Sequence, residues 1–321
     1  KKDFLTLLNI SKNFIYKENT LPFTEKQLNY YLIKDSKKFN SKRKSYTEFT
    51  INKKSGGLRT INAPIKGLKE FQKALNLVLQ SVHEPHKNAT GFIQERSIID
   101  NASAHVGQNY VYNIDLKDFF PSIDASRVWG RLLHPPFNLK STPERKHIAN
   151  MIKTLCCTEL EVERYKDGEW KKEKKLVLPQ GAPTSPTLTN AICDKLDRRL
   201  TGVAKRFGLN YSRYADDITF SSSHNSFKNQ MGELESIYSQ NSTFKKELLK
   251  VIHEQNFHIK ESKVRLQKRG YKQEVTGIIV NDKINVSRTY IKNLRHLIYF
   301  WEKFGFEKAS ELFLKKYILD K

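Results

Sequence analysis

Hydrophobic and polar residues alternate along two stretches of the chain that also carry acidic residues. In residues 110–121, YVYNIDLKDFFP, the alternation predicts a buried strand with Asp115 near its end. In residues 211–221, YSRYADDITFS, β-branched and aromatic residues flank Asp216 and Asp217 on both sides. That pattern is typical of a hairpin with both carboxylates at its turn. A buried carboxylate without a partner is costly, so these acids require a compensating charge.

Other segments repeat their apolar residues every three to four positions, which predicts helices. Residues 1–34 are expected to form two short helices, the second capped by Thr24. Ser287 is expected to cap a C-terminal helix, which a shorter helix over 307–319 follows. The remaining predicted helices cover residues 68–82, 125–133, 143–155, 185–206 and 227–255.

Turn-forming residues separate several shorter predicted strands. Two hairpins are predicted, one with strands 47–51 and 58–62, and a charged one with strands 160–165 and 170–177. Residues 274–280 predict a further strand. At 321 residues, the chain is long enough to form several lobes around one site.

The charge balance of the chain predicts a polyanionic partner. The formal net charge is +23, from 57 Lys and Arg against 34 Asp and Glu, which favours nucleic acid as the partner. There is no long apolar run and no signal-peptide pattern, so we expect no membrane partner. Cys156, Cys157 and Cys193 are too few for a disulfide framework or a zinc site. We therefore expect these cysteines in the core of a cytoplasmic protein.

A cluster of aspartates suits divalent cations. Mg²⁺ prefers oxygen ligands, and a pair of such ions can stabilise the attacking and leaving oxygens of a phosphoryl displacement. An Asp-Asp pair alone more often bonds the backbone of its own turn. The third carboxylate, Asp115, is what favours the metal interpretation, whereas Asp118 is expected to be a hydrogen-bonding or surface acid.

Several features have two interpretations at this level. The Gly- and Pro-rich loop 178–186 is either a nucleotide site at a helix N-terminus or a corner between a strand and a helix. The Lys-rich turn 53–57 either lies over phosphates or protects a sheet edge from aggregation. The cationic C-terminal helices either hold a duplex backbone or form a solvated bundle. His105, taken alone, is more typical of a structural histidine.

Three motifs together resemble those of reverse transcriptases, in the right order and at suitable separations. They are DLKDFF at 115–120, LPQG at 178–181 continuing to Ser185 and Pro186, and YADD at 214–217. Two more resemble motifs of retron reverse transcriptases, namely NASAH at 101–105 and VTG at 275–277. The resemblance covers about residues 45–285.

This resemblance implies an α+β, right-hand polymerase fold with fingers, a palm with an antiparallel sheet, and a short helical thumb. In chain order, the implied parts are an N-terminal helical segment (1–34), fingers (35–110), palm with the first metal aspartate (111–125), a fingers/palm insertion with the charged hairpin (126–177), palm (178–283) and thumb (284–321).

The resemblance also implies a metal site. Asp115, Asp216 and Asp217 would be the catalytic residues. Together with the backbone carbonyl of Leu116 they would bind two Mg²⁺ ions, for which Mn²⁺ can substitute.

Nucleotide and RNA contacts are implied in the same way. Arg59 would hold the triphosphate of a nucleotide lined by Gln180 and Gly181. Phe120 matches the steric gate that excludes a ribose 2′-OH, and Lys263 would protonate the leaving pyrophosphate. The residues expected to contact RNA are Asn101, His105, Val275, Thr276, Gly277, Arg288, Lys292 and Arg295.

A retron enzyme is an RNA-directed DNA polymerase that starts from a guanosine 2′-OH of its own structured non-coding RNA. It copies part of that RNA into single-stranded DNA joined to it, the msDNA. The resemblance therefore implies this RNA, its msDNA and dNTPs as partners in a bacterial cytoplasm, with a separate effector protein in anti-phage defence.

Two alternatives stay open. One is a group II intron-like or diversity-generating reverse transcriptase, against which the lack of a maturase or endonuclease extension argues. The other is a non-catalytic RNA-binding scaffold, against which the intact aspartates argue.

Overall fold

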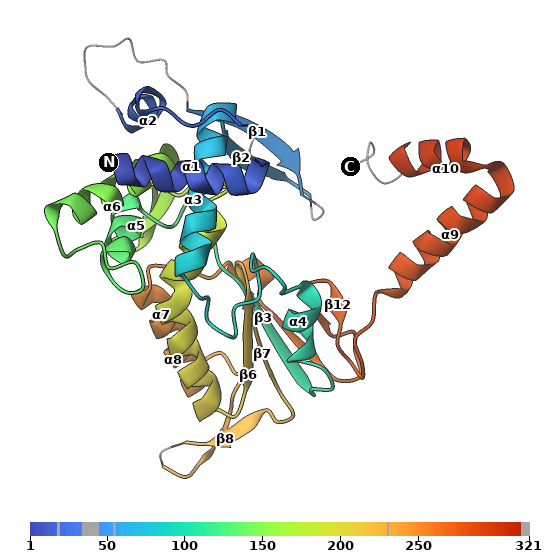
Figure 1. The fold of residues 1–321 in the computed structure, drawn as a ribbon. Coiled ribbons are helices and arrows are strands. Elements are labelled where there is room, and N and C mark those ends of the chain that lie inside the picture. The colour runs from blue at the N-terminus through green and yellow to red at the C-terminus, as the bar shows by residue number, and fades with distance from the viewer. Residues whose placement is uncertain (18–19, 34–44, 54–55, 230, 316–321) are drawn as a thin grey trace.

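A four-stranded antiparallel sheet organises the molecule (Figure 1). In the computed structural model, which describes residues 1–17, 20–33, 45–53, 56–229 and 231–315, the strand order is β10-β3-β7-β6. The strands are β3 (Tyr110–Asp115), β6 (Asn210–Tyr214), β7 (Asp217–Ser222) and β10 (Arg265–Lys268). The strand predicted within 110–121 and the hairpin predicted within 211–221 are both confirmed.

One face of the sheet packs on helices. These are α7 (Ser185–Arg206) and α8 (Thr243–Glu254), which lie on the same side of the strands (Figure 1). The Phe244 ring of α8 contacts the rings of Tyr112 and Phe220, with centroid distances of 6.3 and 5.3 Å. The apolar positions predicted for α7 are buried. The alternation of the strands thus places their aromatic side chains in the main core.

A smaller unit covers the opposite face. It consists of α4 (Ile98–Ser103) and the short strands β11 (Glu274–Val275) and β12 (Ile278–Ile279). Val111 of β3 packs there against Ala102 and Val275 in a separate apolar cluster. The two motifs that resemble retron enzymes therefore lie next to each other, behind the strands that lead to the aspartates.

The helices and hairpins predicted in the first half of the chain are confirmed, with small differences in length. Thr24 accepts a hydrogen bond from the Gln27 amide in a capping box, as expected. Residues 54–55 of the first predicted turn lie outside the described residues. The elements are α1 (Lys2–Tyr16), α2 (Glu25–Leu32), β1 (Tyr46–Asn52), β2 (Leu58–Pro64), α3 (Lys66–Val82), α5 (Ala125–Leu133), α6 (Pro143–Cys156), β4 (Thr158–Lys166) and β5 (Glu169–Val177).

The helix predicted over 227–255 is wrong in its first half. Residues there form a small hairpin of β8 (Ser226–Lys228) and β9 (Leu234–Ser236), and the helix begins only at Thr243. The Asn229 side chain accepts hydrogen bonds from the amides of Met231 and Glu233, and Gly232 has a φ of +81°. These local bonds stabilise a turn that competes with the helix.

The strand predicted over 274–280 is also wrong as one element. Thr276 and Gly277 have φ values of +48° and +86°, so the VTG motif reverses the chain between β11 and β12. Glycine tolerates this left-handed conformation without steric cost.

The C-terminal helices extend away from the rest of the molecule (Figure 1). They are α9 (Arg288–Phe304), capped by Ser287 as predicted, and α10 (Phe306–Phe313). Residues 316–319 of the last predicted helix lie outside the described residues. The described part of α9 has no buried side chain.

The three cysteines are buried, as predicted for core residues. Across the described ranges, no helix combines the length and the apolar character needed to cross a membrane.

Candidate active site

The turn between β6 and β7 places two carboxylates beside the end of β3. Ala215 has a φ of +57°, and Asp216 and Asp217 follow it. Asp115 is directly opposite Asp217 in the strand register. The Leu116 amide also donates a 3.1 Å hydrogen bond to the carbonyl of Asp216. The three aspartates therefore gather at one edge of the sheet.

Lost hydration and the closeness of the other carboxylates both raise the pKa values of Asp216 and Asp217. The pKa of Asp216 is raised, mainly because the surrounding protein removes water and also because Asp115 is close. Lost hydration, with the charges of Asp216 and Asp115, raises the pKa of Asp217 to about 6. Lys263 opposes both shifts, and Arg59 opposes that of Asp216. Carboxylates that resist joint ionisation are stabilised by a cation held between them.

Lys263 supplies part of that positive charge. Its Nζ donates a 2.6 Å hydrogen bond to Oδ2 of Asp115, whose side chain is buried. Within the described residues, no group of three or more His, Cys, Asp or Glu side chains is arranged to hold a metal ion. Asp115 is paired with the lysine instead. The oxygen donors of the cluster are nevertheless the kind that Mg²⁺ takes, so in chemistry the residues fit the ion.

The loop with Gln180 and Gly181 lies against the strand that carries Arg59. The Asn62 amide of β2 donates a 2.8 Å hydrogen bond to the carbonyl of Gln180. Gly181 has a φ of +121°, and a Cβ there would lie 2.8 Å from Cγ2 of Ile61. Only glycine fits this close approach. Arg59 itself is exposed, and its charge acts on Asp216.

Phe120 lies in an aromatic group beside the aspartate turn. It is half-buried, and its ring centroid is 5.5 Å from that of Phe119 and 5.9 Å from that of Phe92. The Phe92 ring in turn lies 6.4 Å from that of Tyr214, two residues before Asp216. The site thus has one apolar wall.

His105 and Asn101, predicted to contact RNA, are instead buried inside the protein. The two ring nitrogens of His105 each lie 2.7 Å from a serine hydroxyl, that of Ser221 and that of Ser212. Burial lowers the pKa of His105 to about 3, so the ring is neutral. Through these two serines the ring links β6 to β7. His105 therefore has the structural role that is typical of a lone histidine.

The VTG motif contacts the same unit. Asn101 accepts a 3.0 Å hydrogen bond from the Thr90 hydroxyl, and its amide lies 3.5 Å from the hydroxyl of Thr276. Val275 is buried, whereas Gly277 is exposed. This arrangement therefore does not support direct contact with RNA by the buried residues Asn101, His105 and Val275. Arg288, Lys292 and Arg295 are exposed on α9.

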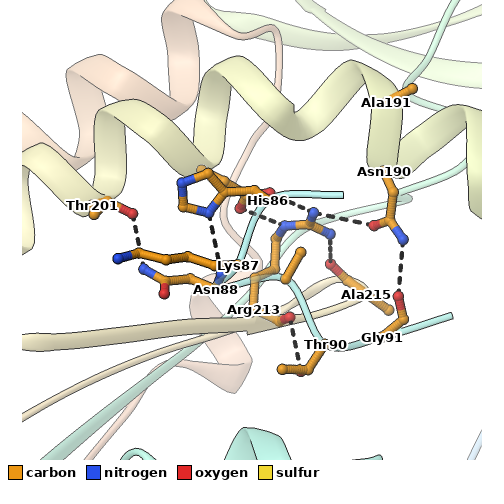
Figure 2. A network of polar contacts seen from close by, with 12 residues as sticks. His86, Lys87, Asn88, Thr90, Gly91, Asn190, Ala191, Thr201, Arg213 and Ala215 are labelled. Carbon is orange, nitrogen blue, oxygen red and sulfur yellow. Dashed lines mark hydrogen bonds and ion pairs between the residues drawn. The ribbon is translucent and has the colours of Figure 1, made fainter. Parts of the chain in front are cut away.

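A buried arginine beside the turn was not singled out from the sequence (Figure 2). Arg213 is fully buried and is paired with Asp197 of α7, which is also fully buried. The sequence does indicate that both residues of this pair are buried. Arg213 lies on the same side of its strand as Tyr211, and Asp197 follows the apolar residue Leu196 in the predicted helix.

Comparisons with known proteins match most of the chain. The family described as "Reverse transcriptase (RNA-dependent DNA polymerase)" matches residues 51–280. Retron Mx65 reverse transcriptase of Myxococcus xanthus is 35% identical over 79% of this chain and 55% of its own length. Retron Ec86 reverse transcriptase of Escherichia coli is 32% identical over 79% of this chain and 69% of its own length.

A structure of apo telomerase from Candida tropicalis, truncated from its C-terminal domain, superposes with a TM-score of 0.47 at 10% identity. The superposition covers 89% of this chain and 60% of that one. This chain spans only about half the length of the Myxococcus relative.

Proposed function

The chain belongs to the reverse transcriptase family, and we propose that it is an RNA-directed DNA polymerase of the retron type. The right-hand polymerase fold expected from the sequence is that of this family. The observation that carries the proposal is the gathering of Asp115, Asp216 and Asp217 at one edge of the sheet. Arg59, whose charge acts on Asp216, supports it.

The parts of the hand follow the ranges expected from the sequence. Residues 35–110 would form the fingers, with 35–44 outside the described residues, and residues 284–321 the thumb. The palm would consist of residues 111–125 and 178–283. Residues 1–34 and 126–177 would be additions to this core, the second containing the charged β4–β5 hairpin. The central sheet and the projecting α9 and α10 support this division.

Asp115, Asp216, Asp217 and the Leu116 carbonyl would hold two Mg²⁺ ions, with Mn²⁺ as a substitute. When bound, such ions stabilise negative charge at the reacting phosphate. The strand register and the hydrogen bond from the Leu116 amide hold the backbones of these residues next to one another, and their side chains would supply the oxygen donors. Lys263, whose Nζ donates a hydrogen bond to Asp115, would give a proton to the leaving pyrophosphate.

The incoming dNTP would lie between the fingers strand and the aspartate edge. Arg59 offers a planar guanidinium for the triphosphate, which it can bind with two parallel hydrogen bonds. The close contact of Gly181 with Ile61 keeps the loop of Gln180 against that strand. These two features support a nucleotide site on this side of the aspartates.

Phe120 would act as the gate that excludes ribonucleotides. We expect Phe120→Ala to incorporate rNTPs at least about tenfold more readily relative to dNTPs, because the ring no longer fills the space of a 2′-OH. Incorporation of each nucleotide on a primed RNA template measures this ratio. Phe92→Ala, which removes the neighbouring ring, is the control. If Phe120→Ala leaves the ratio of rNTP to dNTP incorporation unchanged, Phe120 is a packing residue and not a gate.

The retron part of the proposal concerns the primer and the template. The chain would begin from a guanosine 2′-OH of its own structured non-coding RNA and make msDNA. It would do so in the cytoplasm of a bacterium, with a separate effector protein in anti-phage defence. Candidate RNA contacts are the exposed Gly277 with the half-buried Thr276 beside it, and the exposed Arg288, Lys292 and Arg295 of α9. Asn101 and Val275 would support the Thr276–Gly277 turn from inside, and His105 would support the neighbouring strands β6 and β7.

The test is to express the chain with its native flanking DNA and to analyse the nucleic acid that copurifies. We expect a short DNA whose mobility on a denaturing gel shifts after both RNase and debranching enzyme. If primers are extended but no branched DNA copurifies, the chain is an intron-like or diversity-generating enzyme. If neither product forms, the result favours the non-catalytic RNA-binding scaffold over both polymerase alternatives.

A further inference from the structure

Arg213 lies at the centre of a buried network between helix α7 and the aspartate hairpin (Figure 2). Its Nε and one terminal nitrogen each donate a 2.7 Å hydrogen bond to a different carboxylate oxygen of Asp197. The Tyr211 hydroxyl donates a further 2.6 Å bond to the same carboxylate. The ion pair is therefore bidentate and excludes water.

The same guanidinium contacts the turn that carries the aspartates. A terminal nitrogen of Arg213 donates a 3.0 Å hydrogen bond to the carbonyl of Ala215. Ala215 has the left-handed φ of +57°, a conformation that is uncommon outside glycine, and its carbonyl carbon is bonded to the amide of Asp216. The hydrogen bond thus holds the peptide from which the Asp216 side chain starts.

A second path connects Arg213 to the same turn. Its other terminal nitrogen donates a 3.2 Å hydrogen bond to Oδ1 of Asn190, and the Asn190 amide donates a 2.9 Å bond to the carbonyl of Gly91. Gly91 lies directly against the backbone of Ala215 (Figure 2). The turn is therefore fixed from α7 at two points.

Stability alone does not account for such a pair. Burying two charges costs desolvation energy that well-packed apolar side chains of similar size avoid. What the pair does provide is a rigid donor for two acceptors at a defined position, which an apolar residue cannot supply.

We propose that Arg213, oriented by Asp197, is a positioning residue that sets the backbone at Ala215 and thereby the placement of Asp216 and Asp217. This inference rests on the proposed polymerase function. Arg213 touches no reacting group, so its effect reaches the chemistry through Asp216. Displacement of a reacting group by about 1 Å can cost about a hundredfold in rate.

The test compares Arg213→Lys with Arg131→Lys. Lysine keeps the positive charge beside Asp197 but cannot bond Asp197, Ala215 and Asn190 at once. Arg131 is the control, because it is half-buried and donates to the carbonyls of Ala191 on the same helix and of Pro135, neither of which belongs to the turn. Primer extension on an RNA template gives kcat and the Mg²⁺ concentration for half-maximal rate.

For Arg213→Lys we expect kcat to fall about tenfold to a hundredfold and the half-maximal Mg²⁺ concentration to rise several-fold. RNA affinity should not change, and Arg131→Lys should match the wild type in both kinetic quantities. Asn190→Ala keeps the Arg213–Asp197 ion pair and removes only the connection through Asn190 to Gly91. It therefore tests the positioning role if Arg213→Lys fails to fold. We expect the same shifts from it, smaller in size.

Folded variants with wild-type kcat and Mg²⁺ dependence would overturn the inference. If the wild type itself extends no primer, the proposed function fails separately. The positioning role is then decided by the Mg²⁺-induced change in melting temperature. Arg213→Lys should reduce that change and Arg131→Lys should not; equal changes in the two variants would overturn the role.

Discussion

Replacing Asp216 by asparagine is expected to abolish DNA synthesis, with a rate loss of about a thousandfold or more, while RNA binding survives. Asp216 and Asp217 share one turn opposite Asp115, and their pKa values are raised first by lost hydration and then by the neighbouring negative charges. A carboxamide has nearly the same shape as a carboxylate but lacks the charge that attracts a divalent cation. The loss should therefore fall on catalysis and leave the fold and the RNA surface unchanged.

The matched control is Asp118→Asn, three residues after Asp115. Asp118 is exposed and has a φ of +47°, a conformation that asparagine tolerates. Primer extension with labelled dNTPs and filter binding of the RNA give the two readouts for both variants. Synthesis at the wild-type rate by Asp216→Asn would show that the metal assignment is wrong. An equal loss of synthesis rate in Asp118→Asn would show that removing any nearby negative charge is enough to stop synthesis, and that the effect is not specific to Asp216.

Local signals explain which elements could be predicted from the sequence. Strands β3 and β7 alternate apolar and polar residues, and Thr24 and Ser287 cap their helices with their own side chains. Such signals lie within a few residues of the element that they define. The aspartates were found for the same reason, because strand ends and a tight turn mark their positions.

The errors arose where local turn chemistry competed with a periodic pattern. Phe227, Leu234 and Ile237 occur at intervals that suit a helix, but the side-chain bonds of Asn229 close a turn between the first two. In 274–280, the β-branched residues suit a strand, but Gly277 allows the reversal that divides it. Periodicity alone cannot distinguish these outcomes.

The sequence signals that Arg213 and Asp197 are buried, but the partners that support the candidate active site could not be predicted, because these contacts join separate elements of the fold. His105 bonds serines that lie more than a hundred positions away in the sequence, and Arg213 bonds a different element altogether. Along β6, Arg213 points toward α7, whereas Ser212 points toward the α4 side. The hairpin that carries Asp216 is consequently held from both faces, by an ion pair on one and by a neutral histidine on the other.

Gly91→Ala is expected to reduce the polymerisation rate roughly a hundredfold and to lower the melting temperature by several degrees. A Cβ at position 91 would lie 2.5 Å from the backbone nitrogen of Ala215 and 3.1 Å from the carbonyl carbon of Tyr214. These are backbone atoms of the turn that leads to Asp216, so they cannot move aside as the end of a flexible side chain can. Relief of the clash must displace either residue 91 or the turn.

Gly130→Ala and Gly202→Ala are the matched controls. Both glycines lie in helices, and a Cβ at either would meet no atom within 4 Å apart from its chain neighbours and the backbone of its own helix. Alanine is the better helix former by up to about 1 kcal/mol, so each control should keep its rate and melt at the same temperature or higher.

Thermal melts and primer extension at saturating Mg²⁺ separate the two effects. If Gly91→Ala melts early but keeps its rate, the strain is absorbed away from the aspartates, and the backbone at Ala215 is not what limits catalysis. If rate and stability fall together while the controls hold, the aspartate turn depends on the space that this glycine leaves.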